Sequence, residues 1–314
     1  LDELGNVVDT LQYTGRNVAT FVEAQFPCET GRGKNGITYV QFDRLEDGVR
    51  AGLDGGISYL GADRRPRANE AGWFGQRLEY DEGGWLTLRT VLGEDGNPQA
   101  DTEGITLYRF TRNEIGDGVR VDYQSASGVP EPGSTGVAGR RSEYDDVGNE
   151  VKRTFLGVDG KPTLSASGYA GWQATFDDRG NEIETIYVGL DDTPVLRAKG
   201  YAGWRSRYDA NDREIQRLFL DADRKGALRE EGYSGWRLEY DAAGNEILRS
   251  YIDADGNPTT SMGGVARLRQ EFGEGGNLTR LILLDADGKP TRGNMNIAGI
   301  KASFDSEEKA LSLS

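Results

Sequence analysis

Short stretches of alternating apolar and charged residues recur along this chain, and a cluster of Asp, Gly and Asn follows most of them. In the clearest copy, Trp236–Tyr240 (WRLEY) is followed by Asp241–Asn245 (DAAGN) and then by Glu246–Ile252 (EILRSYI). Alternation of this kind is typical of a half-buried β-strand, and Asp, Gly and Asn favour tight turns. Because the last stretch is rich in β-formers, the pattern predicts a β-hairpin.

A second cluster, Asp253–Pro258 (DADGNP), ends the predicted return strand. Proline has no N–H to donate to a neighbouring strand, so pairing should stop there or lie at a sheet edge. A linker, TTSMG in this copy, then leads to Gly264, which opens the next hairpin. Each repeat is therefore expected to contain one hairpin and two turns.

The hairpins recur with a period of 32 residues. Glycine occupies seven successive positions at this spacing, and Asn296 takes the eighth. The seven are Gly72, Gly104, Gly136, Gly168, Gly200, Gly232 and Gly264. A fixed period in this range is the signature of a repeat architecture, in which each unit buries its apolar face against its neighbours. The sequence predicts an all-β fold, an elongated twisted antiparallel sheet or superhelix of about eight β-hairpin repeats of 32 residues.

The repeats are expected over residues 48–314, and residues 1–47 are expected to form an N-terminal half-repeat and an atypical cap. A short helix is predicted from Asn17 to Phe26, with its apolar residues on one side. Gly36–Asp43 (GITYVQFD) reads as a degenerate unit, about four residues out of register. Terminal repeats are usually atypical. A damaged repeat is the alternative to a cap.

The two ends of the chain carry partial units. Leu1–Val8 (LDELGNVV) resembles the middle of a repeat, so the chain is expected to start with the second half of a hairpin. Phe304–Leu313 is expected to be the first half of one. Unpaired terminal strands of this kind are complementary edges that would build rings or filaments. A fragment of a longer array is the alternative.

The composition narrows the function classes. The net charge of −15 argues against nucleic acid as the main partner. The single cysteine, Cys28, excludes an internal disulfide framework, and no apolar run is long enough to predict a membrane span. The chain contains no histidine, which removes the commonest general base and the commonest metal ligand. We therefore expect a protein that is not an enzyme.

The turn that follows the first strand carries a motif, aromatic-Asp-x-x-Gly-Asn. It occurs as Tyr144–Asn149 (YDDVGN), Phe176–Asn181 (FDDRGN) and Tyr240–Asn245 (YDAAGN). This motif resembles the YD repeat of bacterial Rhs-type surface and toxin proteins, although the period is longer here and Gly-Arg-Leu does not follow the Asn. The resemblance covers about a quarter of each unit. It implies a bacterial β-hairpin repeat protein outside the cytoplasm, in the cell envelope or extracellular, and supplies no catalytic residues.

A ladder of aromatic residues is the first candidate binding site. Its members are Tyr169, Tyr201, Tyr233, Trp172, Trp204 and Trp236. Aromatic platforms spaced along a sheet could stack against the sugar rings of a polysaccharide. The tryptophans share strand parity with Phe176, which favours core packing, whereas the tyrosines have the opposite parity and are expected to be the exposed set.

The second candidate is a calcium site at the aspartates of successive turns. These are Asp253, Asp255, Asp285 and Asp287. Calcium prefers several oxygen ligands at once, but Gly264 and Asn296 stand where an EF-hand loop would need its Glu. Turn formation alone explains the same residues. No other cofactor is expected.

The third candidate is a basic column that could bind an acidic polymer. It holds Arg77, Arg109, Arg141, Arg205, Arg237, Arg269 and Lys301. Glutamates on the same face, and Glu150, Glu182, Glu214 and Glu246 on the return strands, make cross-strand ion pairs the simpler explanation.

These patterns together predict a non-enzymatic structural or adhesive protein, whose partners are itself or other envelope proteins. A carbohydrate-binding repeat module that uses the Tyr/Trp ladder is the alternative. Catalysis ranks third, because no position is seen to break the repeat and install a distinct set of residues.

Overall fold

The computed structural model describes residues 8–12, 39–45, 53–273, 275–293, 298–304 and 310–313. Every regular element in these ranges is a β-strand, so the predicted all-β class is confirmed. The helix predicted from Asn17 to Phe26 and residues 1–7 of the predicted half-repeat lie outside the described residues.

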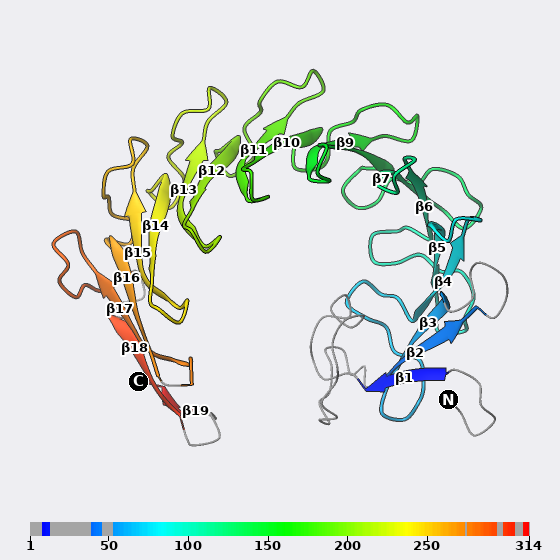
Figure 1. Cartoon of the computed structure of the whole chain (residues 1–314), viewed down its shortest axis with the longest axis horizontal. Coiled ribbons are helices and arrows are strands. Elements are labelled where there is room, and N and C mark those ends of the chain that lie inside the picture. The colour runs from blue at the N-terminus through cyan, green and yellow to red at the C-terminus, as the bar shows by residue number, and fades with distance from the viewer. Residues whose placement is uncertain are drawn as a thin grey trace. The chain divides into compact units, whose positions relative to one another are not determined.

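The chain divides into two compact units, Leu1–Tyr144 with Arg153–Ala166, and Asp145–Lys152 with Ser167–Ser314. The strands follow one another in chain order within each unit (Figure 1). Unit 1 contains β1 (Val8–Gln12), β2 (Tyr39–Arg44), β3 (Asp54–Leu60), β4 (Gly75–Tyr80), β5 (Leu86–Leu92), β6 (Leu107–Arg112), β7 (Gly118–Gln124) and β8 (Gly139–Tyr144). Residues of β9 (Glu150–Leu156) belong to both units. Unit 2 contains β10 (Gly171–Phe176), β11 (Glu182–Val188), β12 (Gly203–Tyr208), β13 (Glu214–Leu220), β14 (Gly235–Tyr240), β15 (Glu246–Ile252), β16 (Arg267–Phe272), β17 (Leu278–Leu284), β18 (Gly299–Phe304) and β19 (Ala310–Leu313).

The strands repeat with the predicted period. The return strands β11, β13, β15 and β17 begin 32 residues apart, at Glu182, Glu214, Glu246 and Leu278. In each of the hairpins β10–β11, β12–β13, β14–β15 and β16–β17, a strand of six residues pairs with a return strand of seven through a β-bulge. Three further residue pairs join each return strand to the first strand of the next hairpin. The tandem-hairpin architecture is therefore confirmed.

Each repeat contains three turns of one design, rather than the two that we expected. We call them turn A (Asp241–Asn245), turn B (Asp253–Asn257) and turn C (Ser261–Val265) in the repeat that ends at Val265. In each, the first N–H donates to the fifth C=O and the fourth N–H donates to the first C=O, at 2.8 to 3.1 Å. The fourth residue is a glycine with φ between 72° and 90°. A side chain is disfavoured in this left-handed region, which explains the glycine columns.

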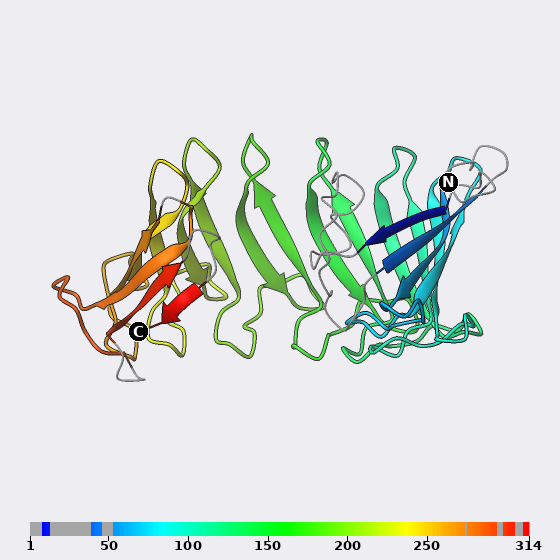
Figure 2. The same ribbon diagram turned by 90° about the horizontal axis from the view of Figure 1, so that it is seen from below.

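Turn A connects the two strands of a hairpin, whereas turns B and C lie between hairpins, so the turns gather at opposite ends of the strands (Figure 2). Pro258 follows turn B and forms only an isolated bridge with Ile252. The next N–H, that of Thr259, donates to the carbonyl of Tyr251 at 3.0 Å. The segment that we expected to be a plain linker therefore folds back along the return strand before turn C.

Where the YD motif carries a tyrosine, its hydroxyl ties the repeat to the preceding one. The hydroxyl of Tyr240 donates to the carbonyl of Glu214 at 2.8 Å, and Tyr208 makes the same bond to Glu182 at 2.9 Å. Phe272 has no hydroxyl at this position. There the side-chain amide of Gln270 donates to the carbonyl of Glu246 at 3.0 Å instead.

The last residues of the return strands β11, β13, β15 and β17 lie in the core. Val188, Leu220, Ile252 and Leu284 are at most 2% exposed. These side chains are apolar, so their burial removes apolar surface from water in four successive repeats of unit 2.

The two ends of the array differ in part from expectation. β2 and β3 pair as an ordinary hairpin, but their connection spans Leu45–Leu53, where later hairpins have five residues. This accounts for the predicted shift of about four residues. At the other end, Ala310–Leu313 pairs with β18, so the prediction that the chain finishes in the first half of a hairpin is wrong. The last repeat therefore includes the beginning of its return strand, β19.

Candidate functional site

Aromatic side chains from three consecutive repeats of unit 2 form a continuous row, which we call the aromatic row. It consists of Tyr169, Trp172, Tyr187, Tyr201, Trp204, Phe219, Tyr233, Trp236 and Tyr251. Neighbouring rings have centroid separations of 4.4 to 6.4 Å. These distances are typical of packed aromatic pairs. Core packing is therefore the observed role of Trp172, Trp204 and Trp236.

The expectation that the ladder tyrosines are exposed is wrong. Tyr201 is only 8% exposed, and Tyr169 and Tyr233 are half-buried against the same cluster as the tryptophans. The physical reason is that each tyrosine precedes its strand, which begins at Gly171, Gly203 or Gly235, so strand parity does not extend to it. Binding of a polysaccharide by these six residues stays a prediction.

Two arginines, which the sequence reasoning did not single out, cover the row. The guanidinium carbon of Arg197 lies 4.5 Å from the ring centre of Tyr187, 5.3 Å from that of Tyr169 and 5.7 Å from that of Tyr201. Arg229, one repeat later, lies 4.4 Å from Phe219, 5.7 Å from Tyr201 and 5.6 Å from Tyr233. A cation over an aromatic face is attracted by the ring quadrupole.

Arg197 also donates hydrogen bonds to phenol oxygens, to Tyr187 at 2.9 Å and to Tyr201 at 3.3 Å. Burial raises the pKa of Tyr187 to about 12, against the opposing effect of Arg197. The phenol is therefore neutral at physiological pH and accepts a bond from the arginine.

A second pair of arginines lies over the tryptophans. Arg217 is 5.3 Å from the ring centre of Trp204, and Arg249 is 5.3 Å from that of Trp236. Arg217 pairs with Glu214 and Arg249 pairs with Glu246, each three residues away on its own strand. The expected cross-strand pairing of these two glutamates with the basic column is therefore wrong.

Arg205 of the basic column makes a cross-strand ion pair, but with Glu184, at 2.6 Å. Of the glutamates that open the return strands, Glu214 and Glu246 are thus used differently from the expectation. An acidic polymer along the basic column stays untested.

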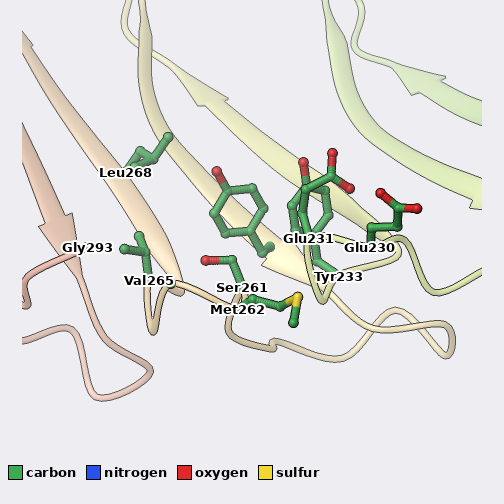
Figure 3. A pocket seen from close by; sticks show the side chains of 10 residues that line it. Glu230, Glu231, Tyr233, Ser261, Met262, Val265, Leu268 and Gly293 are labelled. Carbon is green, nitrogen blue, oxygen red and sulfur yellow. The ribbon is translucent and has the colours of Figure 1, made fainter. Parts of the chain in front are cut away.

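The aromatic row ends in a pocket of about 550 Å³. Figure 3 shows Glu230, Glu231 and Tyr233 on one side of it and Val265 and Leu268 on the other, with Ser261 and Met262 between. Tyr251, Gly263 and Gly293 complete the lining. At this site the residues differ from those of the preceding repeat, and the expectation that the chain is not an enzyme stays a prediction.

Three residues that differ from those at the same positions of the preceding repeat leave room for the pocket. Val265 stands where the preceding repeat has Tyr233, and Leu268 stands where it has Trp236. Ser261 stands where the two preceding repeats have Arg229 and Arg197. The simultaneous change at these three repeat positions was the sequence signal for the site. It is missed when each repeat position is compared separately, because a change at one position looks like ordinary variation.

The pocket is negative and aromatic. Glu231 pairs with Arg229 at 2.6 Å but remains 49% exposed, and Glu230 makes no ion pair within the described ranges. Tyr233 and Tyr251 are stacked with an interplanar angle of 23°. Burial raises the pKa of both phenols, so they are neutral at physiological pH. The lining suits a positive or neutral ligand and disfavours an anion.

The candidate calcium aspartates act as turn formers. A carboxylate oxygen of Asp253 accepts the N–H of Asp255 at 3.0 Å and that of Asn257 at 2.8 Å. Asp285 accepts the N–H of Lys289 at 2.9 Å. Within the described ranges, no group of three or more His, Cys, Asp or Glu side chains is arranged to hold a metal. Calcium binding by Asp253, Asp255, Asp285 and Asp287 stays a prediction.

Unit 1 carries an acid at the position that Arg197 and Arg229 occupy in unit 2. A carboxylate oxygen of Asp101 accepts bonds from the Trp73 indole at 3.1 Å and from the Tyr108 hydroxyl at 2.5 Å. Burial, and then this bond, raise the pKa of Tyr108. The acid is therefore engaged by two aromatic donors.

Comparison with known proteins yields only distant structural likeness. No family model matches the sequence, and no curated protein matches it. The chain is similar to the crystal structure of TcdB2–TccC3, with 11% identity over 85% of this chain and a TM-score of 0.28. It is also similar to the Photorhabdus luminescens Tc holotoxin pore, with 12% identity over 90% of this chain and a TM-score of 0.28. The chain spans 16% and 17% of those two chains. Likeness at these scores carries no conclusion about function.

The part of the chain that the structure describes contains no helix long and apolar enough to cross a membrane.

Proposed function

We propose that this chain is a non-enzymatic structural or adhesive repeat protein of the bacterial cell envelope or exterior. The observation that carries the proposal is the repeated set of bonds between successive hairpins, with strand pairs, tyrosine–carbonyl bonds and turn-to-turn bonds recurring along each unit. A sheet built in this way is extended by adding identical connections. The location rests on the YD-type motif alone.

Self-association through end strands is the sharper form of the proposal. β1 lies at the end of the strand run of unit 1, and β19 lies at the end of that of unit 2 (Figure 1). Backbone groups on an end strand can pair with another chain.

Polysaccharide binding along the Tyr/Trp ladder has less support. The rings of the aromatic row pack against one another, and Arg197 and Arg229 lie over several of them. A sugar would need open ring faces in successive repeats.

Light scattering across a wide range of protein concentration, with electron micrographs of the same samples, tests self-association. We expect assemblies that are lost in Thr10→Pro, because a proline in β1 removes a backbone donor from an end strand. The matched control is Glu94→Pro, at the second position of turn Gly93–Asn97, where proline is favoured. A strict monomer at all concentrations would contradict self-association. Detection of the chain only after lysis of intact source cells would contradict the surface location.

A further inference from the structure

The pocket occupies the place that an arginine side chain fills in each of the two preceding repeats. Arg197, Arg229 and Ser261 stand at the same repeat position, 32 residues apart. Each arginine lies over the ring ten residues before it, at 4.5 Å for Tyr187 and 4.4 Å for Phe219. The ring ten residues before Ser261 is that of Tyr251, and both residues line the pocket.

The environment of Arg197 is the closest template for the pocket. Arg197 lies beside the ring pair Tyr169 and Tyr187, whose centroids are 4.7 Å apart, and donates to the Tyr187 hydroxyl at 2.9 Å. The equivalent residues at the pocket are Tyr233 and Tyr251, again two tyrosines. No described residue bonds to either of these hydroxyls. The site thus retains the ring faces and the phenol acceptors but lacks the guanidinium.

The charge around the pocket complements a cation. Glu230 and Glu231 are the charged side chains of the lining. Arg229, 5.6 Å from the Tyr233 ring centre, pairs with Glu231, so Glu230 is the lining carboxylate without an ion pair within the described ranges. The chain carries a net charge of −15. Leu268, in place of a tryptophan, leaves additional room beside the rings. A planar guanidinium stacks on aromatic faces and presents several donors at once, which a compact ammonium group does not do.

We propose that the pocket binds an arginine side chain presented by a basic segment of a partner protein. Its guanidinium lies over Tyr251, donates to the hydroxyls of Tyr251 and Tyr233, and faces Glu230 and Glu231. The proposal goes beyond the structural role and holds whether or not the chain self-associates.

Titration of the full chain with blocked peptides, followed by calorimetry and NMR, tests the proposal. The probes are acetyl-Gly-Arg-Gly-amide, the lysine analogue, and the citrulline analogue, which has the shape of arginine without its charge. We expect the arginine peptide to bind with a Kd on the order of 1 mM, and the citrulline peptide to bind about tenfold more weakly. Equal binding of the citrulline or lysine peptide would overturn guanidinium recognition, as would binding of neutral sugars without binding of the arginine peptide.

Ser261→Arg is the decisive variant, because it supplies the missing side chain from the protein itself. We expect it to abolish peptide binding and to melt no lower than the wild type. Asn257→Arg is the matched control, since it adds the same charge on an exposed turn outside the lining. It should bind the peptide within about twofold of the wild type. Glu231→Gln should weaken binding roughly threefold. Retention of binding by folded Ser261→Arg would overturn the proposal.

Discussion

Among the described residues, four occupy glycine positions in the turns without being glycine. Arg64, Asp192, Asp212 and Arg224 have φ of 59° to 61°. A side chain in this region is strained by about 1–2 kcal/mol. Ion pairs to other turns or strands offset the strain at Asp192 with Lys152, at Asp212 with Arg179, and at Arg224 with Glu184.

Replacement of Arg224 separates the backbone strain from the ion pair. Arg224→Gly should raise the free energy of unfolding by about 0.5 kcal/mol, because relief of strain exceeds loss of a half-exposed ion pair. Glu184 keeps its pair with Arg205. Arg224→Ala loses the ion pair and keeps the strain, so it should be less stable than Arg224→Gly by about 1 kcal/mol. Urea unfolding of the three proteins checks the order, and an alanine variant as stable as the glycine variant would contradict it.

At the scale of elements, the sequence predicted strands and turn A closely. The expected strand Trp236–Tyr240 is observed as β14, Gly235–Tyr240, because alternation and turn residues are local signals. Turn C was missed because in unit 2 its first residue is Ser261, Arg229 or Arg197, and the Asn or Asp that marks a turn stands there only at Asn69 and Asp101 of unit 1. The burial of Tyr201 depends on that turn, so it could not be read from strand parity.

The aspartate of turn A makes the turn sensitive to acid. The side-chain amide of Asn245 donates to Asp241 at 2.9 Å, and this bond is the main cause of the lowered pKa of Asp241. A lowered folded-state pKa stabilises the fold above the unfolded value of about 3.9, and the contribution is lost as the pH falls through the folded value. Asp145 and Asp177 have lowered pKa values for the same reason. The melting temperature should therefore fall as the pH is lowered below about 4.

Asn245→Ala should raise the pKa of Asp241 toward its ordinary value, because it removes the amide donor while the backbone bonds to the carboxylate remain. Carboxyl NMR titration of Asp241 measures this directly, and Asp145 in its unchanged turn is the internal control. An unchanged Asp241 pKa in the variant would show that the side-chain bond is not the cause.

The tyrosine–carbonyl bond between repeats should contribute to stability. Tyr240→Phe removes the bond to the Glu214 carbonyl and should lower the free energy of unfolding by about 1 kcal/mol. Phe272→Tyr is the matched control, because Gln270 already donates to the equivalent carbonyl of Glu246. It should change stability by less than about 0.5 kcal/mol. Equal effects of the two substitutions in denaturant unfolding would argue against this role.

At the scale of the whole molecule, the sequence predicted the repeat period but not the aromatic row. The 32-residue spacing follows from the numbering of glycines alone. The row depends on which repeat positions meet in space, and residues ten apart, such as Arg197 and Tyr187, come together only after turn B folds the chain back. The pocket at Ser261 also forms where several repeat positions come together in the fold, so no single repeat position predicts it.

A repeat array should tolerate the loss of one whole unit and not of half a unit. Deletion of residues 203–234 joins Ala202 to Gly235, which recreates the local sequence Tyr-Ala-Gly-Trp found at Tyr201–Trp204. Because each repeat contacts only its neighbours, β11 can then pair with β14 as it did with β12. We expect cooperative urea unfolding with an m-value lower by about a tenth, in proportion to the surface lost. Deletion of residues 203–218 removes β12 and breaks β13, so it should abolish cooperative unfolding. If the two deletion variants unfold with the same cooperativity, the repeats are not interchangeable. The regular 32-residue spacing would then need an explanation other than the stacking of repeats.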